Sequence, residues 1–258
     1  MILCLDIGNS HIFGGVFEQD ELKLTFRKAS KSGSSSDEYG LFFRSVLREN
    51  GIDPAGVTAI AMCSVVPEVV YAISASCRKY FDLAPFILQA GVKTGLKIGY
   101  QNPLEVGTDR IANAIAGTQL YPDQDLLILD LGTATTLCAI GKGKLYKGGV
   151  IVPGLRMSMQ ALDSGTSKLR AVEIVRSEKA LGRTTAESIQ SGLFLGHLGA
   201  LREITNRVVE EEYAGQRPTV LATGGFASLF EHTGLFDLLL PDLALQGLRL
   251  AYAMNTTN

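Results

Sequence analysis

Two short segments of this chain share one pattern, an apolar stretch that ends in aspartate, any residue and glycine. The first covers residues 3–10 and contains Asp6, and the second covers residues 128–135 and contains Asp130. Each segment precedes two further strand patterns joined by a polar turn, expected at residues 11–17 and 22–28 and again at 134–140 and 145–152. A unit of three strands therefore occurs twice, at a spacing far longer than the roughly 20–50 residues of solenoid repeats. The chain is predicted to fold as two related halves.

The turn after each aspartate has the composition of an anion-binding loop. Glycine lets the backbone approach a ligand and direct its N–H groups at a phosphate, and the Asn or Thr that follows adds a donor. Neither turn is a Walker loop, because no G-x-x-x-x-G-K-[ST] occurs and no helical pattern follows. Each turn taken alone is more often a plain hairpin. Two facing turns can hold one nucleotide between them, so the duplication favours a phosphate-binding function.

Composition narrows the class of ligand. The 258 residues, 46% hydrophobic and 19% charged, suffice for a sizeable core in one large or two smaller domains. A formal net charge of −2 without a Lys or Arg run argues against nucleic acid or an anionic membrane as partner. Four cysteines without C-x-x-C spacing indicate reduced core thiols. With no signal-peptide features and no apolar run near the roughly 20 residues of a membrane span, the expectation is a cytoplasmic protein that binds small molecules.

Helical and strand patterns alternate along the rest of the chain. After a polar loop over residues 30–36, Ser35 and Glu38 form a capping-box pattern that opens a helix to Asn50. A long helical pattern runs from Ala186 to about Glu212. Further strands are expected at residues 57–64, 86–89 and 219–223. Further helices are expected at residues 67–80 and 154–162. A helix should also begin at residue 111, a short one should end at residue 230, and the last should begin at residue 243. The alternation predicts a mixed α/β fold whose central strands are parallel.

Residues 91–110 are the least regular part of the chain, because glycines and a proline interrupt every period. Irregular loops of this length in a compact domain are often functional. The loop ends with Asp109 and Arg110 at the start of a helical pattern, where free N–H groups and the helix dipole favour an acidic side chain. An ordinary acidic helix start beside a surface arginine explains the spacing equally well.

Seven motifs, taken in order, resemble those of the type III pantothenate kinases, a family of the acetate and sugar kinase, Hsc70 and actin superfamily. They are Asp6-Ile7-Gly8-Asn9-Ser10, Ser64-Val65-Val66-Pro67, Gly107-Thr108-Asp109-Arg110, Asp130 to Thr135, Gly148-Gly149 through Pro153-Gly154, Gln190-Ser191-Gly192, and Ala222-Thr223-Gly224-Gly225. The resemblance covers nearly the whole chain. It implies an α/β, duplicated actin-like (ribonuclease H-like) fold. The implied halves, residues 1–120 and 121–258, would each contain a three-strand meander plus parallel strands and helices.

The same resemblance implies an activity, the transfer of the γ-phosphoryl group of ATP to the primary hydroxyl of pantothenate in the first step of coenzyme A biosynthesis. Asp109 would accept the hydroxyl proton, Asp130 would hold a monovalent cation, K⁺ or NH₄⁺, and Mg²⁺ would accompany ATP. The implied ATP-binding residues are Asp6, Ile7, Gly8, Asn9, Ser10, His11, Ile12, Phe13 and Thr133. The implied substrate-binding residues are Tyr100, Gly107, Thr108, Asp109, Arg110 and Thr185. Arg110 would either bind the pantothenate carboxylate or hold Asp109 in place.

Two positions depart from the family pattern, and two other functions remain open. Ser10 replaces the usual Thr but keeps the hydroxyl, and Thr184 stands where relatives often have Asn, beside Thr185. One alternative is a phosphatase or ATPase of the same superfamily. The other is an accessory factor that binds nucleotide without turnover. The joint presence of Asp6, Asp109, Arg110 and Asp130 argues against a degenerate member.

The long helical pattern from Ala186 also predicts a homodimer. Its apolar residues spread over roughly 240° of the helix surface, more than the ~100° stripe that one core contact needs. Gly192, Gly196 and Gly199 form a smooth strip on which another helix could pack closely. Packing of both faces within one subunit is the alternative. The family resemblance favours a dimer in which Thr185 reaches the substrate pocket of the partner.

Overall fold

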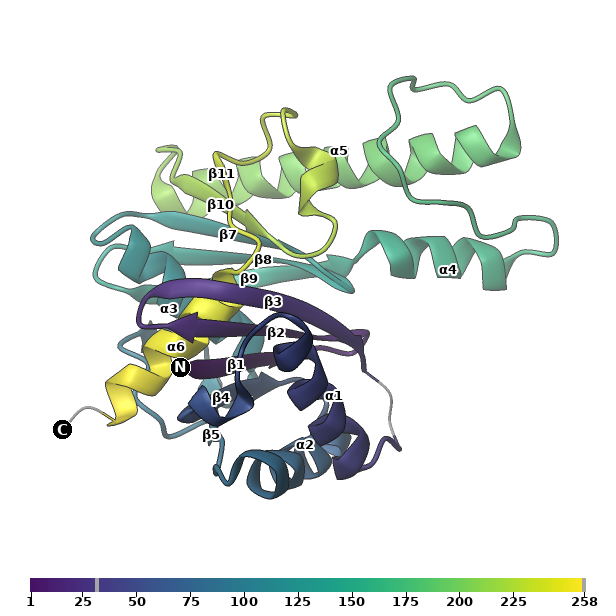
Figure 1. Ribbon diagram of the computed structural model, residues 1–258. Helices are drawn as coiled ribbons and strands as arrows, with labels where there is room; N and C mark the ends of the chain where they lie inside the picture. The colour runs from purple at the N-terminus through teal and green to yellow at the C-terminus, as the bar shows by residue number, and fades with distance from the viewer. Residues whose placement is uncertain (31–32, 257–258) are drawn as a thin grey trace. The chain divides into compact units, whose positions relative to one another are not determined.

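A computed structural model describes residues 1–30 and 33–256 of the chain, which fold into two compact units (Figure 1). Lys31 and Ser32, in the expected polar loop, lie outside the described residues. The first unit is built from residues 1–96, 101–116 and the segment from 243 on, and the second from residues 97–100 and 117–242. The chain therefore passes between the units four times.

The first unit contains a five-stranded sheet in the order β3-β2-β1-β4-β5. Its meander is formed by β1 (Ile2–Ile7), β2 (His11–Glu18) and β3 (Glu21–Ala29), which pair antiparallel. On the other side of β1, β4 (Ala59–Ser64) and then β5 (Phe86–Ile87) join in parallel. The carboxyl ends of β1 and β4 consequently lie at the same edge of the sheet.

Helices α1 (Ser36–Glu49) and α2 (Pro67–Phe81) lie side by side and pack on this sheet, as Figure 1 shows. The predicted capping box is present, because the Ser35 side chain accepts from the Glu38 N–H and the Glu38 carboxylate from the Ser35 N–H. Alternate residues of β1 and β4 meet the helices in one core, which includes Leu3, Leu5, Ile7, Ile60, Met62, Tyr39, Phe43, Leu47, Val69, Ile73 and Cys77. Burial of this apolar face stabilises the unit.

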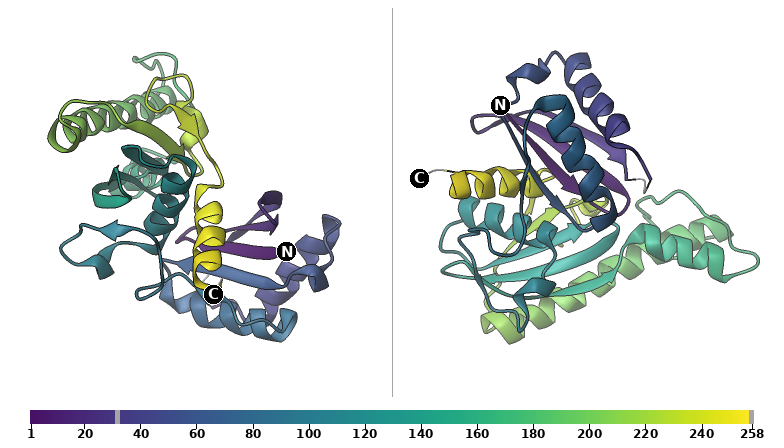
Figure 2. Two further views of the ribbon diagram at one scale, coloured as in Figure 1. Left: turned by 90° about the vertical axis from the view of Figure 1, so that its left-hand side faces the viewer. Right: turned by 90° about the horizontal axis from the view of Figure 1, so that it is seen from below.

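Helix α6 (Leu243–Thr256) completes the first unit, where it packs on β1, β2 and β4 (Figure 2). It also lies against α3 (Thr108–Leu120) at Gly247, where an added Cβ would overlap the carbonyl oxygen of Ala112. Glycine is required there because the two backbones approach so closely. The first unit also contains the 3-10 turns η1 (Pro54–Gly56) and η2 (Pro103–Glu105).

The second unit repeats this arrangement in a sheet of order β11-β10-β7-β8-β9-β6. Strands β7 (Leu126–Leu131), β8 (Ala134–Gly141) and β9 (Leu145–Pro153) form an antiparallel meander, and β10 (Thr219–Thr223) pairs in parallel with β7. The order β9-β8-β7-β10-β11 matches β3-β2-β1-β4-β5 strand for strand, including one register shift in each meander. The predicted duplication is confirmed at the level of topology.

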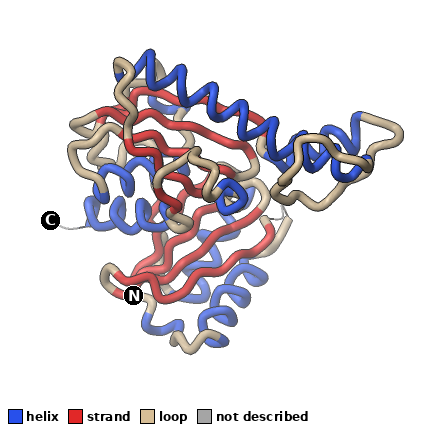
Figure 3. Tube along the Cα trace, turned by 90° about the horizontal axis from the view of Figure 1, so that it is seen from above, coloured by secondary structure: helices blue, strands red, loops and turns tan. Residues whose placement is uncertain are grey.

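Two helices distinguish the second unit. Figure 3 shows α5 (Thr185–Tyr213) running along the sheet, with its N-terminal part beside α4 (Leu155–Gly165). Its apolar face meets the sheet and the 3-10 turn η3 (Ala227–Phe230) in a core that includes Leu127, Leu129, Leu131, Leu193, Phe194, Leu198, Leu201 and Phe230. The long helix predicted from Ala186 is confirmed.

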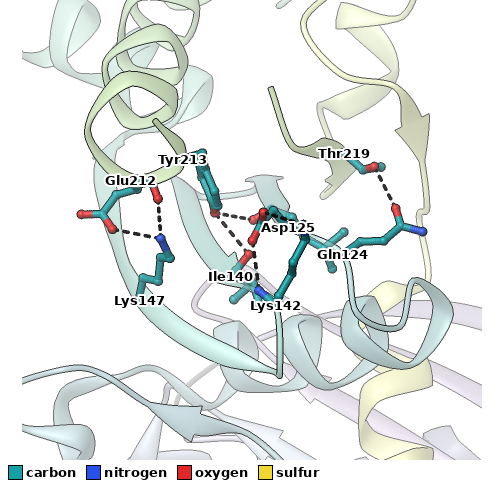
Figure 4. Close-up of polar contacts among 9 residues, drawn as sticks. Gln124, Asp125, Ile140, Lys142, Lys147, Glu212, Tyr213 and Thr219 are labelled. Atoms are coloured by element: carbon teal, nitrogen blue, oxygen red, sulfur yellow. Dashed lines mark hydrogen bonds and ion pairs between the residues drawn. The ribbon is translucent and has the colours of Figure 1, made fainter. Parts of the chain in front are cut away.

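The C-terminal end of α5 is fixed to the sheet by polar contacts (Figure 4). The buried Tyr213 hydroxyl donates to the carbonyl oxygens of Leu126, at 2.8 Å, and Ile140, at 3.3 Å, which are partners in the β7–β8 register. Lys147 donates to the carbonyl oxygen of Glu212 and lies 3.4 Å from its carboxylate. Burial raises the pKa of the Tyr213 hydroxyl, so it stays protonated and serves as a donor.

Two strands were not predicted, β6 (Lys97–Ile98) and β11 (Leu238–Leu239), and each contains two residues. The predicted state of the cysteines is confirmed, because Cys4, Cys63, Cys77 and Cys138 are all buried and none of them forms a disulfide. Within residues 1–30 and 33–256, no helix combines the length and apolar character needed to cross a membrane.

Candidate active site

The first predicted phosphate loop is the tight turn between β1 and β2. The Gly8 N–H donates to the carbonyl oxygen of His11 at 3.0 Å, and the same oxygen would lie 3.2 Å from a Cβ at Gly8. The Ser10 carbonyl oxygen accepts from the Ser30 N–H, which ties the turn to the end of β3. Asn9 is exposed at the tip. The turn is therefore closed by its own backbone hydrogen bonds and presents Asn9 to solvent.

The carboxyl ends of β1 and β4 gather three side chains of the first unit. Asp6 stands opposite Cys63 in the parallel register, and the Cys63 thiol donates to Asp6 Oδ1 at 3.3 Å. One residue further along β4, the Ser64 carbonyl oxygen accepts from the Thr108 hydroxyl at 3.1 Å. This contact holds the start of α3 at the edge where Asp6 lies. The negative charge of Asp109, in the first turn of α3, also raises the pKa of the Cys63 thiol.

The Gly107-x-Asp109-Arg110 motif has a local geometric cause. Asp109 Oδ1 accepts from the Arg110 N–H at 2.8 Å, which folds the carboxylate back over the chain. A Cβ at position 107 would lie 2.5 Å from the same oxygen, so a larger residue there would force the Asp109 carboxylate to move. The Arg110 guanidinium is buried and donates to the Glu105 carbonyl oxygen at 3.3 Å, which joins η2 to the helix start. The motif thus forms a compact, partly exposed acidic helix start.

The second predicted phosphate loop, with Gly132 and Thr133, lies between β7 and β8 in the second unit. Gly154, at the start of α4, packs directly on it, because a Cβ there would overlap the carbonyl oxygens of Thr133 and Gly132. Gly224 closes it from β10: its φ is +94°, and a Cβ would lie 2.6 Å from both Asp130 Oδ1 and the Leu131 backbone. Glycine backbones from three segments therefore surround the loop and the Asp130 carboxylate.

A buried histidine supports the strand that leaves this loop. His197 Nε2 lies 3.0 Å from the Thr135 hydroxyl, and the imidazole contacts the ring of Phe230, with centroids 5.8 Å apart. Burial lowers the pKa of His197, which favours the neutral imidazole. His197 therefore has a structural role in the second unit.

Tyr100, expected in the substrate pocket, belongs to the second unit. The backbone before it pairs with β9, because the Gly99 N–H donates to the Tyr146 carbonyl oxygen at 2.8 Å. The two tyrosine rings meet edge to face with centroids 6.3 Å apart. Tyr146 is fully buried and donates from its hydroxyl to the Cys138 sulfur at 3.1 Å, which fixes the surface that Tyr100 packs on.

Thr185 is the exposed first residue of α5 and borders an apolar cavity of about 790 Å³ between α4 and α5. Thr184 caps the helix, because its hydroxyl accepts from the Glu187 N–H and the Glu187 carboxylate accepts from the Thr184 N–H. The cavity is lined by Pro153, Met157, Ala161, Leu162, Ile189 and Leu193, among others. The departure from the family pattern at Thr184 therefore keeps a helix-capping residue.

Comparison with known proteins decides the family. The model of the type III pantothenate kinases matches residues 2–207. A type III pantothenate kinase of Legionella pneumophila (strain Corby) is 58% identical over 256 residues, which cover 99% of this chain and 100% of that protein. Type III pantothenate kinase 1 of Francisella tularensis subsp. holarctica (strain OSU18) is 45% identical over 99% of this chain and 100% of its own length.

The chain belongs to the type III pantothenate kinase family. A Baf-family protein of Campylobacter jejuni has a similar fold, with a TM-score of 0.62 at 17% identity over 98% of each chain. The ROK hexokinase of Thermus thermophilus aligns with a TM-score of 0.50 at 15% identity over 97% of each chain. The predicted duplicated actin-like fold and the assignment as a kinase are confirmed.

The residues that the family resemblance names fall in both units. Asp6 to Phe13 and Gly107 to Arg110 lie in the first unit, and Tyr100, Asp130, Thr133 and Thr185 lie in the second. Sequence patterns do not assign Cys63 or His197 to the site, and they include Gly154 only as the end of a family motif. Their contacts come from strand register and from helix packing between residues far apart in sequence, whereas the motifs are local.

Proposed function

We propose that this kinase transfers the γ-phosphoryl group of ATP to the primary hydroxyl of pantothenate, with Asp109 as the proton acceptor. The observation that carries this assignment is the geometry of the helix start. Asp109 is held partly exposed over Gly107, on the segment that Thr108 ties to the carboxyl end of β4. Phosphoryl transfer asks a protein mainly for positioning and charge stabilisation, so one well-placed carboxylate and two phosphate loops are a sufficient set of parts.

In this proposal ATP is bound by residues 6–13 and by Thr133. The tight Gly8 turn with its exposed Asn9 in the first unit and the glycine-surrounded loop in the second unit support it, since tight glycine turns are typical of phosphate-binding loops. Residues 1–120 then supply phosphate loop 1 and the substrate loop, and residues 121–258 supply phosphate loop 2 and the dimerisation helix. Pantothenate would contact Tyr100, Gly107, Thr108, Asp109, Arg110 and Thr185.

Asp130 is proposed to hold the monovalent cation. The surroundings of Asp130 suit an ion that prefers oxygen ligands. The carboxylate lies against the backbones of Gly132 and Gly224, where a side chain has no room. Among the residues that the structure describes, no cluster of three or more His, Cys, Asp or Glu side chains could hold a transition metal. K⁺ or NH₄⁺ there would offset the repulsion between Asp130 and the ATP phosphates, and Mg²⁺ would arrive with ATP.

We also propose that the kinase is a cytoplasmic homodimer, with Thr185 completing the pocket of the partner. Gly192, Gly196 and Gly199 are exposed on α5, and a Cβ added at any of them would have no neighbour within 4 Å. The apolar cavity that Met157 and Gly192 line adds to this uncovered surface, and Ile151 and Leu181 are further exposed apolar side chains of the same unit. Such a surface suits a second copy of the chain. The four buried thiols fit a reducing compartment.

A coupled assay of ADP release with and without pantothenate tests the activity. The kinase should release ADP only when pantothenate is present, in a one-to-one ratio to phosphorylated product. Equal ADP release in both samples would instead identify the ATPase alternative. Nucleotide binding without any turnover would identify the accessory-factor alternative.

A further inference from the structure

Cys63 is a buried thiol at the edge of the first sheet that the proposed reaction does not use. It lies one residue before the end of β4, in direct register with Asp6 of β1. Its side chain is fully buried, and the thiol donates to Asp6 Oδ1 at 3.3 Å. This contact joins an interior side chain to the carboxylate that opens phosphate loop 1.

The protonation state of the thiol follows from its surroundings. Burial raises the pKa of Cys63 well above its usual range, and the negative charges of Asp6 and then Asp109 raise it further. The group therefore remains S–H and acts as a neutral donor. A lysine or arginine in its place would pair with Asp6 and cancel its charge, whereas a thiol can orient the carboxylate and leave its charge intact.

We propose that Cys63 is a positioning residue for ATP use: its S–H fixes the Asp6 carboxylate in the orientation that phosphate loop 1 needs. This inference rests on the proposed function, in which Asp6 belongs to the ATP-binding loop. Asp6 lies two residues before Gly8, near the end of β1, so the direction of its carboxylate sets the charge beside the turn that would face the nucleotide. Pantothenate recognition, which the proposal assigns to other segments, should not depend on the thiol.

The alternative role for Cys63 is to fill space in the core. Cys77 provides the matched control, because it is equally buried in the same unit and lies in α2, away from Asp6. Substitution of either cysteine by alanine removes a similar volume and should cost similar stability. A core-filling role predicts the same kinetic effect for both substitutions. A positioning role predicts an effect on ATP for Cys63 alone.

The test compares steady-state kinetics of Cys63→Ala, Cys63→Val, Cys63→Ser and Cys77→Ala with the unmodified enzyme. We expect Cys63→Ala and Cys63→Val to lower kcat/KM for ATP about tenfold, the size of one charge-assisted hydrogen bond. The KM for pantothenate should stay within twofold. Cys63→Ser, which restores a donor, and Cys77→Ala should stay within threefold of the unmodified enzyme for both substrates. If the alanine variant does not fold, the valine variant, whose slightly larger side chain leaves no cavity, carries the comparison.

Two results would overturn the inference: Cys63→Ser impaired as strongly as Cys63→Ala and Cys63→Val, or Cys63→Ala and Cys63→Val no worse than Cys77→Ala. Titration of each variant with a non-hydrolysable ATP analogue gives a second readout, in which the donor-less variants should bind about tenfold more weakly. Failure of the proposed function is distinguishable, because the unmodified enzyme would then show no pantothenate-dependent ADP release.

Discussion

Asp109 owes its conformation to the residue two positions before it. The carboxylate folds back to accept from the Arg110 N–H and occupies the space that a side chain at Gly107 would fill. A carboxylate at the first turn of a helix is stabilised there by free N–H groups, but that argument applies to any acidic helix start. The geometry becomes specific because Thr108 also binds the Ser64 carbonyl oxygen, which fixes the helix start against β4.

Replacement of Asp109 by asparagine should lower kcat roughly a hundredfold or more, because the amide cannot accept the hydroxyl proton. The melting temperature should change little, since the amide oxygen can still accept from Arg110. Glu105→Gln is the matched control: this exposed acid lies four residues away and should keep near-normal kcat. An Asp109→Asn enzyme with unmodified turnover would show that the acid serves only to start the helix.

The proposed cation site at Asp130 predicts that activity depends on which monovalent cation is present. At constant ionic strength, replacement of Na⁺ by K⁺ or NH₄⁺ should raise kcat/KM for ATP several-fold, because a bound cation offsets carboxylate–phosphate repulsion. Asp130→Asn should remove the difference between cations. A flat response of the unmodified enzyme to Na⁺, K⁺ and NH₄⁺ would contradict a selective monovalent site.

At the scale of elements, α6 approaches α3 closely at Gly247. Gly247→Ala should destabilise the protein by about 2 kcal/mol or more, because overpacking against the Ala112 carbonyl outweighs the roughly 1 kcal/mol gain in helix propensity. Thermal unfolding should show a fall of several degrees. Gly165→Ala, in α4 with open space around the added methyl group, should leave the melting temperature within about a degree or two.

The elements that sequence predicts are those with long periodic patterns and local signals. The helix after Ser35 has a capping box and a repeating apolar face, and the helix after Thr184 has the same cap, so both were identifiable from neighbouring residues. Strands β6 and β11 contain two residues each, too few to show a period, and form only through pairing with β9 and β10.

The candidate site also contains a part that can be predicted from neighbouring residues and a part that cannot. The Gly107-x-Asp109 motif is visible in sequence because its cause lies within four residues. The Cys63–Asp6 contact joins residues 57 positions apart and depends on the parallel register of β1 and β4. A single sequence specifies that both strands are buried but does not give the register between them.

For the whole molecule, the proposed dimer makes a complementation experiment possible. Asp109→Asn and Thr185→Trp proteins should each be inactive, the first without a base and the second with a blocked partner pocket. After mixing and subunit exchange, one site of each heterodimer would combine the unmodified Asp109 and Thr185. Random exchange should therefore restore about a quarter of the normal activity per chain. Full activity of a species that light scattering identifies as a monomer would contradict the arrangement.

The return of α6 to the first unit has a consequence for synthesis in the cell. Translation delivers β1 to β5 early, but Leu243, Leu245 and Leu248, which cover β1, β2 and β4, leave the ribosome only after the entire second unit. Until then one apolar face of the first sheet lacks its cover, so a nascent chain arrested near residue 240 should bind chaperones that recognise exposed apolar surface. The second unit, whose main segment is continuous from residue 117 to 242, can complete its core before the first.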